Sequence, residues 1–147
     1  MAEIVERVSI ARPSEEVWDA LADFGGISRW APGVDHSCLT TEQRDGVGTQ
    51  RRVQVGRNAF LERVVEWEPG HRLAYLIEGL PPVVRSVTNS WELQGSGGST
   101  TVTLASRIDT GPRLPQQVIA RVVGRAMAKA SREMLTGLKS RIEETAA

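Results

Sequence analysis

Apolar and polar residues alternate with a period of two through most of the first three quarters of the chain. Turn signals such as Asp45-Gly46, Gly56-Arg57-Asn58 and Pro69-Gly70 separate the alternating segments, which is typical of an antiparallel meander. The pattern predicts seven strands, near residues 4–11, 36–43, 48–55, 59–68, 72–78, 84–94 and 100–109.

A helical period replaces this alternation directly after the first strand. Ser14 is a suitable N-cap, and the carboxylates of Glu15 and Glu16 favour the first turn of a helix. Gly25-Gly26 ends this helix, and a short helical turn from Ile27 to Trp30 follows.

The last quarter of the chain predicts one long helix, from about Pro115 to Glu144, which is roughly 45 Å at 1.5 Å per residue. A helix of this length needs a broad surface, and a seven-stranded sheet supplies one by curving around it. The predicted fold class is therefore α+β, with a single domain over residues 1–147. The apolar stripe of the helix is expected at Val118, Val122, Ala126, Ala130, Met134 and Leu138, with Ile119, Val123 and Met127 beside it.

Several short motifs accompany this order of elements. They are Pro13-Ser14-Glu15-Glu16-Val17-Trp18, Arg29-Trp30-Ala31-Pro32-Gly33-Val34, Gly48-Thr49 with Arg51-Arg52-Val53, Glu66-Trp67-Glu68-Pro69-Gly70-His71-Arg72-Leu73-Ala74-Tyr75, and Gly98-Ser99-Thr100-Thr101-Val102-Thr103. With them the chain resembles, over nearly its whole length, the START/birch-pollen-allergen (SRPBCC) superfamily, and most closely its polyketide cyclase/dehydrase-type branch. The resemblance implies the helix-grip fold, in which the curved sheet grips the C-terminal helix. Members of that superfamily bind sterols, lipids, plant hormones or polyketides, so the fold alone does not choose the function.

Composition and charge exclude several classes of protein. Lysine plus arginine number 18 and aspartate plus glutamate number 18, which argues against a general nucleic-acid binder. The single cysteine, Cys38, has no partner for an internal disulfide, and we expect a reducing, cytoplasmic setting. The first ten residues lack the pattern of a signal peptide, and no stretch approaches 18 apolar residues, so no integral membrane contact is expected.

Residues for catalysis or metal binding are sparse. No serine or cysteine motif would make His36 or His71 the base of a triad, and the His, Cys and carboxylate spacing predicts neither a metal site nor a cofactor. Alternation places Glu62, Glu66 and Glu68 on one face of a strand. We interpret them as the solvated outer face of the sheet, the alternative being an acid–base pair of carboxylates.

The opposite face of the predicted strands is the expected ligand site. In residues 85–93, alternation groups Arg85 and Asn89 with Val87 and Trp91, and in residues 59–68 it groups Arg63 with the apolar positions. Polar side chains there either contact a ligand or pair within the protein. By resemblance to the cyclases, an arginine would stabilise a developing enolate. The expected ligand-binding residues are Trp30, Val53, Arg63, Tyr75, Arg85, Val87, Asn89, Trp91, Met127 and Met134.

The long helix adds two further expectations. Ala126 and Ala130 would leave volume under the sheet, and Met127 and Met134 would form either an adaptable wall or ordinary core. A basic strip falls roughly opposite the apolar stripe and is either a solvent face or a docking strip for an acidic protein partner or an anionic membrane surface. Its residues are Arg121, Arg125, Lys129 and Arg132.

Three functions fit these observations. The first is binding or carriage of a small hydrophobic or aromatic ligand, such as a lipid or polyketide, in a cavity between sheet and helix. The second is a polyketide cyclase, aromatase or dehydratase that uses the same cavity without a metal or a covalent nucleophile. The third is a ligand-sensing regulatory module. The lack of a paired nucleophile and base favours the first.

Overall fold

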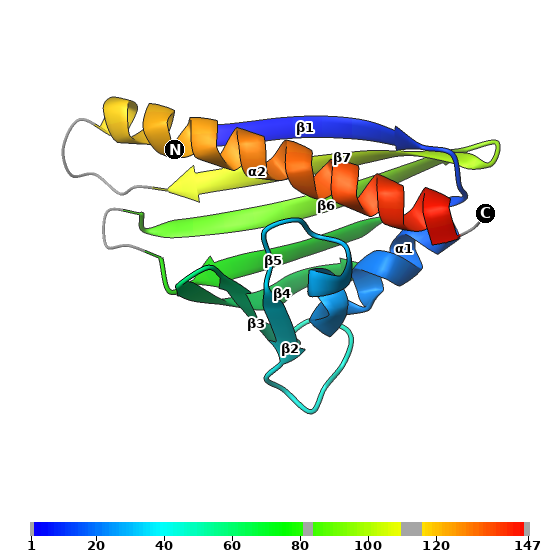
Figure 1. The fold of residues 1–147 in the computed structure, drawn as a ribbon, viewed down its shortest axis with the longest axis horizontal. Coiled ribbons are helices and arrows are strands. Elements are labelled where there is room, and N and C mark those ends of the chain that lie inside the picture. Colours follow the sequence, from blue (N-terminus) through cyan, green and yellow to red (C-terminus); the bar gives the residue numbers. More distant parts are fainter. Residues whose placement is uncertain (1, 81–83, 110–115, 146–147) are drawn as a thin grey trace.

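The computed structural model describes residues 2–80, 84–109 and 116–145. They contain a seven-stranded antiparallel sheet in the order β1-β7-β6-β5-β4-β3-β2 (Figure 1). The strands are β1 (Ala2–Ile10), β2 (His36–Leu39), β3 (Gln50–Val55), β4 (Asn58–Glu68), β5 (Arg72–Glu78), β6 (Ser86–Ser96) and β7 (Ser99–Asp109). The expected number and arrangement of strands are confirmed.

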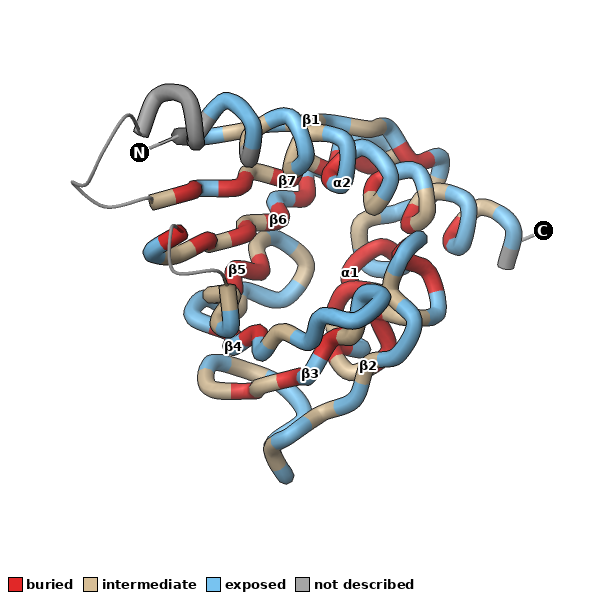
Figure 2. Tube along the Cα trace, turned by 60° about the vertical axis from the view of Figure 1, so that its left-hand side comes forward, coloured by how far each residue is buried: buried red, intermediate tan, exposed pale blue. Residues whose placement is uncertain are grey.

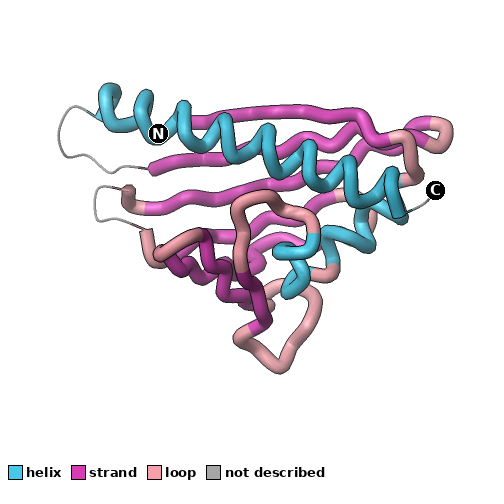
Figure 3. Tube along the Cα trace, in the orientation of Figure 1, coloured by secondary structure: helices cyan, strands magenta, loops and turns pink. Residues whose placement is uncertain are grey.

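The helices of the described chain lie on one side of this sheet (Figure 3). They are α1 (Ser14–Ala22), the 3₁₀ helix η1 (Phe24–Arg29) and α2 (Gln116–Thr145). α2 packs along β1 and β7, and α1 lies beside the C-terminal end of α2 (Figure 1). This arrangement is the helix-grip fold, as expected from the sequence. None of the described helices has the length and apolar character needed to cross a membrane.

Strand register aligns the inward-facing residues of β5, β6 and β7 in rows that cross the sheet. Within these rows every residue except Ile77 is buried. The rows are Ile77–Val87–Ile108, then Tyr75–Asn89–Ser106, then Leu73–Trp91–Leu104. The middle row is polar, whereas the rows on both sides of it are apolar.

A β-bulge in β4 changes which of its residues face inward. The register with β5 shifts between Val64 and Glu66, so one extra residue interrupts the alternation. Glu62 and Val64 face the core, whereas Arg63 is exposed and its guanidinium lies 3.6 Å from Glu78. The prediction that Arg63 points inward is therefore wrong, as is the grouping of Glu62 with the outer carboxylates.

Arg85 is also exposed, contrary to expectation. It precedes β6, which begins at Ser86, and its backbone N–H donates to the Asp109 carbonyl at 2.7 Å. Alternation within the strand therefore does not fix the direction of this side chain.

The expected apolar stripe of α2 turns away from the sheet along its length. A spacing of four residues advances about 40° per step beyond a full turn, so a series spaced by four spirals around the helix. Leu138 is fully buried, but Val122, Ala126 and Ala130 are exposed, which corrects the prediction that the two alanines leave volume under the sheet. The side chains of Val118, Ile119 and Val123 lie outside the described residues.

Candidate functional site

The polar row on the inner face of the sheet is a hydrogen-bonded unit. The Ser106 hydroxyl donates to Asn89 Oδ1 at 2.6 Å, and Asn89 Nδ2 donates to Tyr75 Oη at 3.4 Å. Trp91 Nε1 donates to the same Tyr75 oxygen at 3.2 Å. Direct cross-strand pairing of Tyr75 with Asn89 and of Asn89 with Ser106 holds these groups in line.

Two apolar clusters lie on either side of this row. The smaller consists of Val84, Val87 and Ile108, packed against Ile4, Ile77, Leu80 and Met127. The larger includes Trp91, Leu73, Leu104 and residues of α1, η1 and the C-terminal half of α2. Polar side chains in such a setting must be hydrogen-bonded, because a buried unpaired group costs free energy.

Tyr75 is the residue in this row whose hydroxyl proton is available to donate a hydrogen bond. Its oxygen accepts both hydrogen bonds described above, and no acceptor for its proton lies among the described residues. Burial raises the pKa of the Tyr75 phenol, and the negative charge of Glu62 raises it further. The phenol is therefore protonated at neutral pH and can donate a hydrogen bond.

Trp30 is a second buried donor without a partner. Its side chain lies edge-to-face against Trp91, with ring centroids 5.7 Å apart. Trp30 is 9% exposed, and its Nε1 atom has no hydrogen-bond partner among the residues that the structure describes. Both free groups beside Trp91 are thus donors, which suits an acceptor oxygen on an otherwise apolar ligand.

A buried ion pair supports the row from the neighbouring strands. Arg51 Nε and Nη2 each lie 2.8 Å from Glu62 Oε1, and Arg51 Nη1 donates to the Phe24 carbonyl at 2.8 Å. The guanidinium lies over the Phe24 ring at 3.7 Å and the Tyr75 ring at 4.6 Å. The pair fixes the Tyr75 ring and adds no net charge to the inner face.

The sequence pattern predicts the inward direction of Arg51 but not that of Glu62. Arg51 alternates with Val53, which was expected to face the ligand, so the same reasoning places Arg51 inward. Strict alternation groups Glu62 with Glu66 and Glu68 on the outer face, whereas the bulge between Val64 and Glu66 separates it from them.

The structure brings together most of the expected ligand-binding residues. Met127 and Met134 are half-buried on α2 and pack against the smaller and larger cluster, respectively. Arg63 and Arg85 are exposed and do not belong to the group. The members buried at the inner face are Trp30, Val53, Tyr75, Val87, Asn89 and Trp91. Their contact with a ligand, and the cavity expected between sheet and helix, stay predictions.

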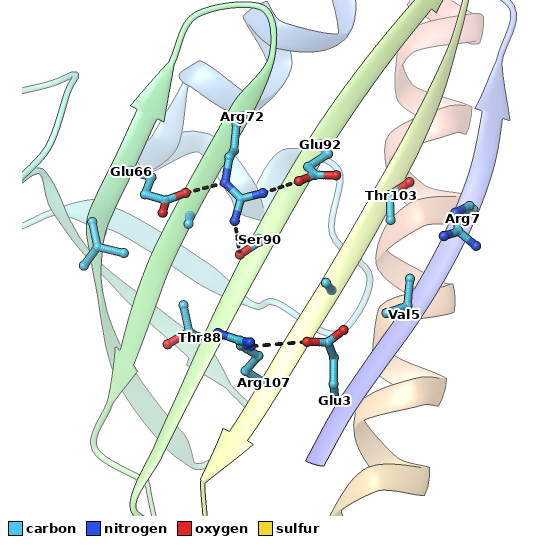
Figure 4. Close-up of a pocket in the computed structure, with 13 residues that line it drawn as sticks. Glu3, Val5, Arg7, Glu66, Arg72, Thr88, Ser90, Glu92, Thr103 and Arg107 are labelled. Carbon is cyan, nitrogen blue, oxygen red and sulfur yellow. Dashed lines mark hydrogen bonds and ion pairs between the residues drawn. The ribbon is translucent and has the colours of Figure 1, made fainter. Parts of the chain in front are cut away.

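The opposite face of the sheet carries a hollow of about 480 Å³ with a different character. Arg72 pairs with Glu66 and Glu92, and Arg107 Nε lies 3.2 Å from Glu3 Oε2 (Figure 4). The Glu66 carboxylate raises the pKa of Arg72. These charged side chains pair with one another in contact with solvent. This face is therefore the solvent-exposed exterior of the sheet, as expected for Glu66.

A smaller hollow of about 400 Å³ lies between α1, η1 and the β4–β5 turn, and Trp18 and Trp67 contribute to its lining. Elsewhere, His36, His71 and Cys38 are exposed, and no group of three His, Cys, Asp or Glu side chains in the described ranges is arranged to hold a metal ion.

Comparison with known proteins agrees with this architecture. A family model described as "polyketide cyclase / dehydrase and lipid transport" matches residues 1–143. The Zhui aromatase/cyclase from Streptomyces sp. R1128 superposes with a TM-score of 0.83 at 19% identity, over 99% of this chain and 96% of that one. A START superfamily protein from Mycobacterium smegmatis superposes with a TM-score of 0.75 at 14% identity, over 97% and 98%. The di-domain ARO/CYC BexL of the BE-7585A biosynthetic pathway gives 0.81 at 20% identity, over 97% of this chain and 47% of that one. At these identities the structures support the fold alone.

Proposed function

The chain belongs to the polyketide cyclase/dehydrase and lipid transport family, and from that premise we propose that it binds a small hydrophobic or aromatic ligand between α2 and the inner face of the sheet. The observation that carries the proposal is the Tyr75–Asn89–Ser106 row between two apolar clusters. Apolar walls with a few fixed polar groups are the usual composition of a small-molecule site.

The free donors define what the ligand presents to this row. Tyr75 Oη–H and Trp30 Nε1–H lack acceptors among the described residues, so a carbonyl or ether oxygen on the ligand would satisfy one or both. The Arg51–Glu62 pair is internally neutral, which favours a neutral ligand over an anion.

Native mass spectrometry of freshly purified protein tests the proposal first. We expect a fraction of the protein to carry an additional small mass that is lost on denaturation. Nile red, a neutral dye with a carbonyl group, tests the same point by a saturable rise in its fluorescence. An unmodified mass together with no saturable Nile red binding contradicts the proposal.

A matched pair of variants on β6 locates the binding. Val87→Phe adds bulk to the inner face, where Val87 is 2% exposed, whereas Thr88→Phe adds the same ring to the outer face. We expect Val87→Phe to weaken Nile red binding severalfold and Thr88→Phe to leave it unchanged, with thermal unfolding checked for each because overpacking costs about 1–3 kcal/mol. Equal effects of the two variants would place the dye elsewhere.

One observation favours a second function, cyclisation of a ketone-bearing chain. A buried phenol with an uncommitted proton is placed to donate a hydrogen bond to a ketone oxygen while a neighbouring enol carbon attacks the ketone carbon. The test is to incubate the protein with a linear poly-β-ketone thioester and follow the absorbance of the aromatic product. The enzyme function requires acceleration by the wild type and its loss in Tyr75→Phe at substrate concentrations that saturate both proteins.

A further inference from the structure

The charged side chains in the N-terminal half of α2 are all positive. Residues 116–132 contain four basic side chains and no acidic one. Arg132 is held by Glu6 at 3.1 Å, whereas Arg121, Arg125 and Lys129 are exposed and make no ion pair with the described residues. With their spacing of four they form a ridge about 12 Å long on the outside of the helix, here called the basic ridge.

An apolar ridge runs beside the basic ridge, about 100° away around the helix, which corrects the expectation that the two lie on opposite sides. It consists of Val122, Ala126 and Ala130, all exposed. Much of the tube of α2 carries the colour of exposed residues in Figure 2. Val122 is 67% exposed, the highest value among the large apolar side chains that the structure describes. The small side chains at 126 and 130 allow a second helix to approach closely. An apolar centre beside charged residues is the composition of a docking surface, since a helix facing only solvent gains nothing from exposed valine.

The complement of this surface is present in the same chain. α1 (Ser14–Ala22) carries Glu15, Glu16 and Asp19 and no basic residue. These three side chains are exposed and, within the described part of the chain, have no ion-pair partner. The helix has nine residues and is about 13 Å long, which matches the basic ridge.

Within one molecule α1 does not meet the basic ridge, because it lies beside the opposite, C-terminal end of α2 (Figure 1). Both helices lie on the same side of the sheet (Figure 3). A two-fold axis perpendicular to α2 at its middle places the α2 helices of two copies antiparallel. The α1 helix of each copy then lies at the basic ridge of the other copy. We infer that the protein forms a two-fold dimer through its helical face, in which two identical α1–basic ridge contacts are made.

Exchange of charge between the two helices tests this dimer. One variant carries Arg121→Glu with Arg125→Glu, and the other carries Glu16→Lys with Asp19→Lys. Each variant alone places like charges at both contacts and is expected to be monomeric. Mixed in equal amounts they restore opposite charges at both contacts, so a heterodimer is expected although neither variant self-associates.

Sedimentation equilibrium at about 20 mM and about 500 mM salt provides the measurement, because screening at the higher concentration weakens exposed ion pairs. The wild type is expected to dimerise at low salt, with association weakened about tenfold or more at high salt. The control is Arg52→Glu with Arg57→Glu, two exposed residues outside the helices, which should leave the dimer intact. Thermal unfolding verifies each fold, and Glu16→Gln with Asp19→Asn replaces the lysine variant if that one unfolds.

A wild type that stays monomeric at low salt, even at the highest concentration reached, overturns the inference. So does a dimer that both charge-reversed variants retain. If the wild type is monomeric yet binds an acidic protein or anionic vesicles through the basic ridge, the surface serves a foreign partner and the self-association is refuted.

Discussion

The two faces of the sheet carry similar chemistry in opposite settings. On the inner face Arg51 pairs with Glu62, and their side chains are 3% and 10% exposed. On the outer face Arg72 pairs with Glu66 and Glu92, and the Arg72 side chain is 32% exposed. The outer network keeps water within reach of its charges, whereas the inner pair depends on its partners alone.

This difference shows why the inner face is informative about function. Water satisfies any outer group that loses its partner, so an unpaired polar atom there means little. At the inner face an unpaired donor such as Tyr75 Oη–H or Trp30 Nε1–H has no such compensation. For this reason we propose the polar row as the place where a ligand oxygen binds.

Removal of one charge from each face should give the largest difference between the two faces in the free energy of unfolding. Arg51→Leu leaves the Glu62 carboxylate buried without its partner and should lower the free energy of unfolding by about 3–5 kcal/mol. Arg72→Leu should cost about 1 kcal/mol or less, because its partners are half-exposed. Urea unfolding measures both.

The double variant Arg51→Leu with Glu62→Leu separates the pair from the packing around it. Removing both charges leaves none unpaired, so most of the lost stability should return. If the double variant is as unstable as Arg51→Leu, the loss comes from the contacts of the guanidinium with Phe24 and Tyr75 rather than from the bare carboxylate.

Apolar truncation sharpens the same comparison. Leu104 on the inner face of β7 is fully buried, whereas Val5 on the outer face of β1 is 39% exposed. Leu104→Ala should lower stability by about 2–5 kcal/mol, and Val5→Ala by about 0.5 kcal/mol or less. Similar values for the two variants would mean that the outer face is covered in solution.

Alkaline pH should act on the inner face through the only tyrosine of the chain. Burial raises the pKa of Tyr75 in the folded state above the ordinary value of 10.0, so above that pH the unfolded chain loses a proton that the folded chain keeps. This stabilisation is complete below pH 10 and is lost as the pH rises further, by up to about 1.4 kcal/mol per pH unit. The tyrosinate absorbance should accordingly appear together with unfolding.

Tyr75→Phe is the control for the alkaline titration, because it removes this contribution and leaves those of the lysines and arginines. A tyrosinate signal that rises near pH 10 in the folded protein would show that the phenol is in contact with solvent.

The sequence predicts the inner face of the sheet correctly wherever a strand alternates without interruption. The uninterrupted alternation of β6 predicts that Asn89 and Trp91 face inward, and both are buried. Alternation predicts the wrong faces for Glu62 and Arg63, because one extra residue at the β4 bulge shifts the pattern. A spacing of four spirals around the helix and therefore predicts the wrong side for Val122. The buried positions Leu135, Leu138 and Ile142 follow spacings of three and four.

The hydrogen bonds of the site cannot be predicted from the residue pattern. Nothing in a pattern of residues shows that the Tyr75 oxygen accepts from two neighbours while its proton stays free. That information depends on strand register, which sets Tyr75 opposite Asn89 and Asn89 opposite Ser106.

Nile red affinity of Tyr75→Phe, compared with Thr88→Val on the outer face, tests the central claim most directly. The phenylalanine variant keeps the ring and removes the hydroxyl, which is the proposed donor to the ligand and also accepts from Asn89 and Trp91. We expect its dissociation constant to rise about 2- to 12-fold, the range for a neutral hydrogen bond of 0.5–1.5 kcal/mol. Thr88→Val should bind as the wild type does. Unchanged affinity in Tyr75→Phe, with a melting temperature that shows it folded, would contradict the assignment of the polar row as the binding site.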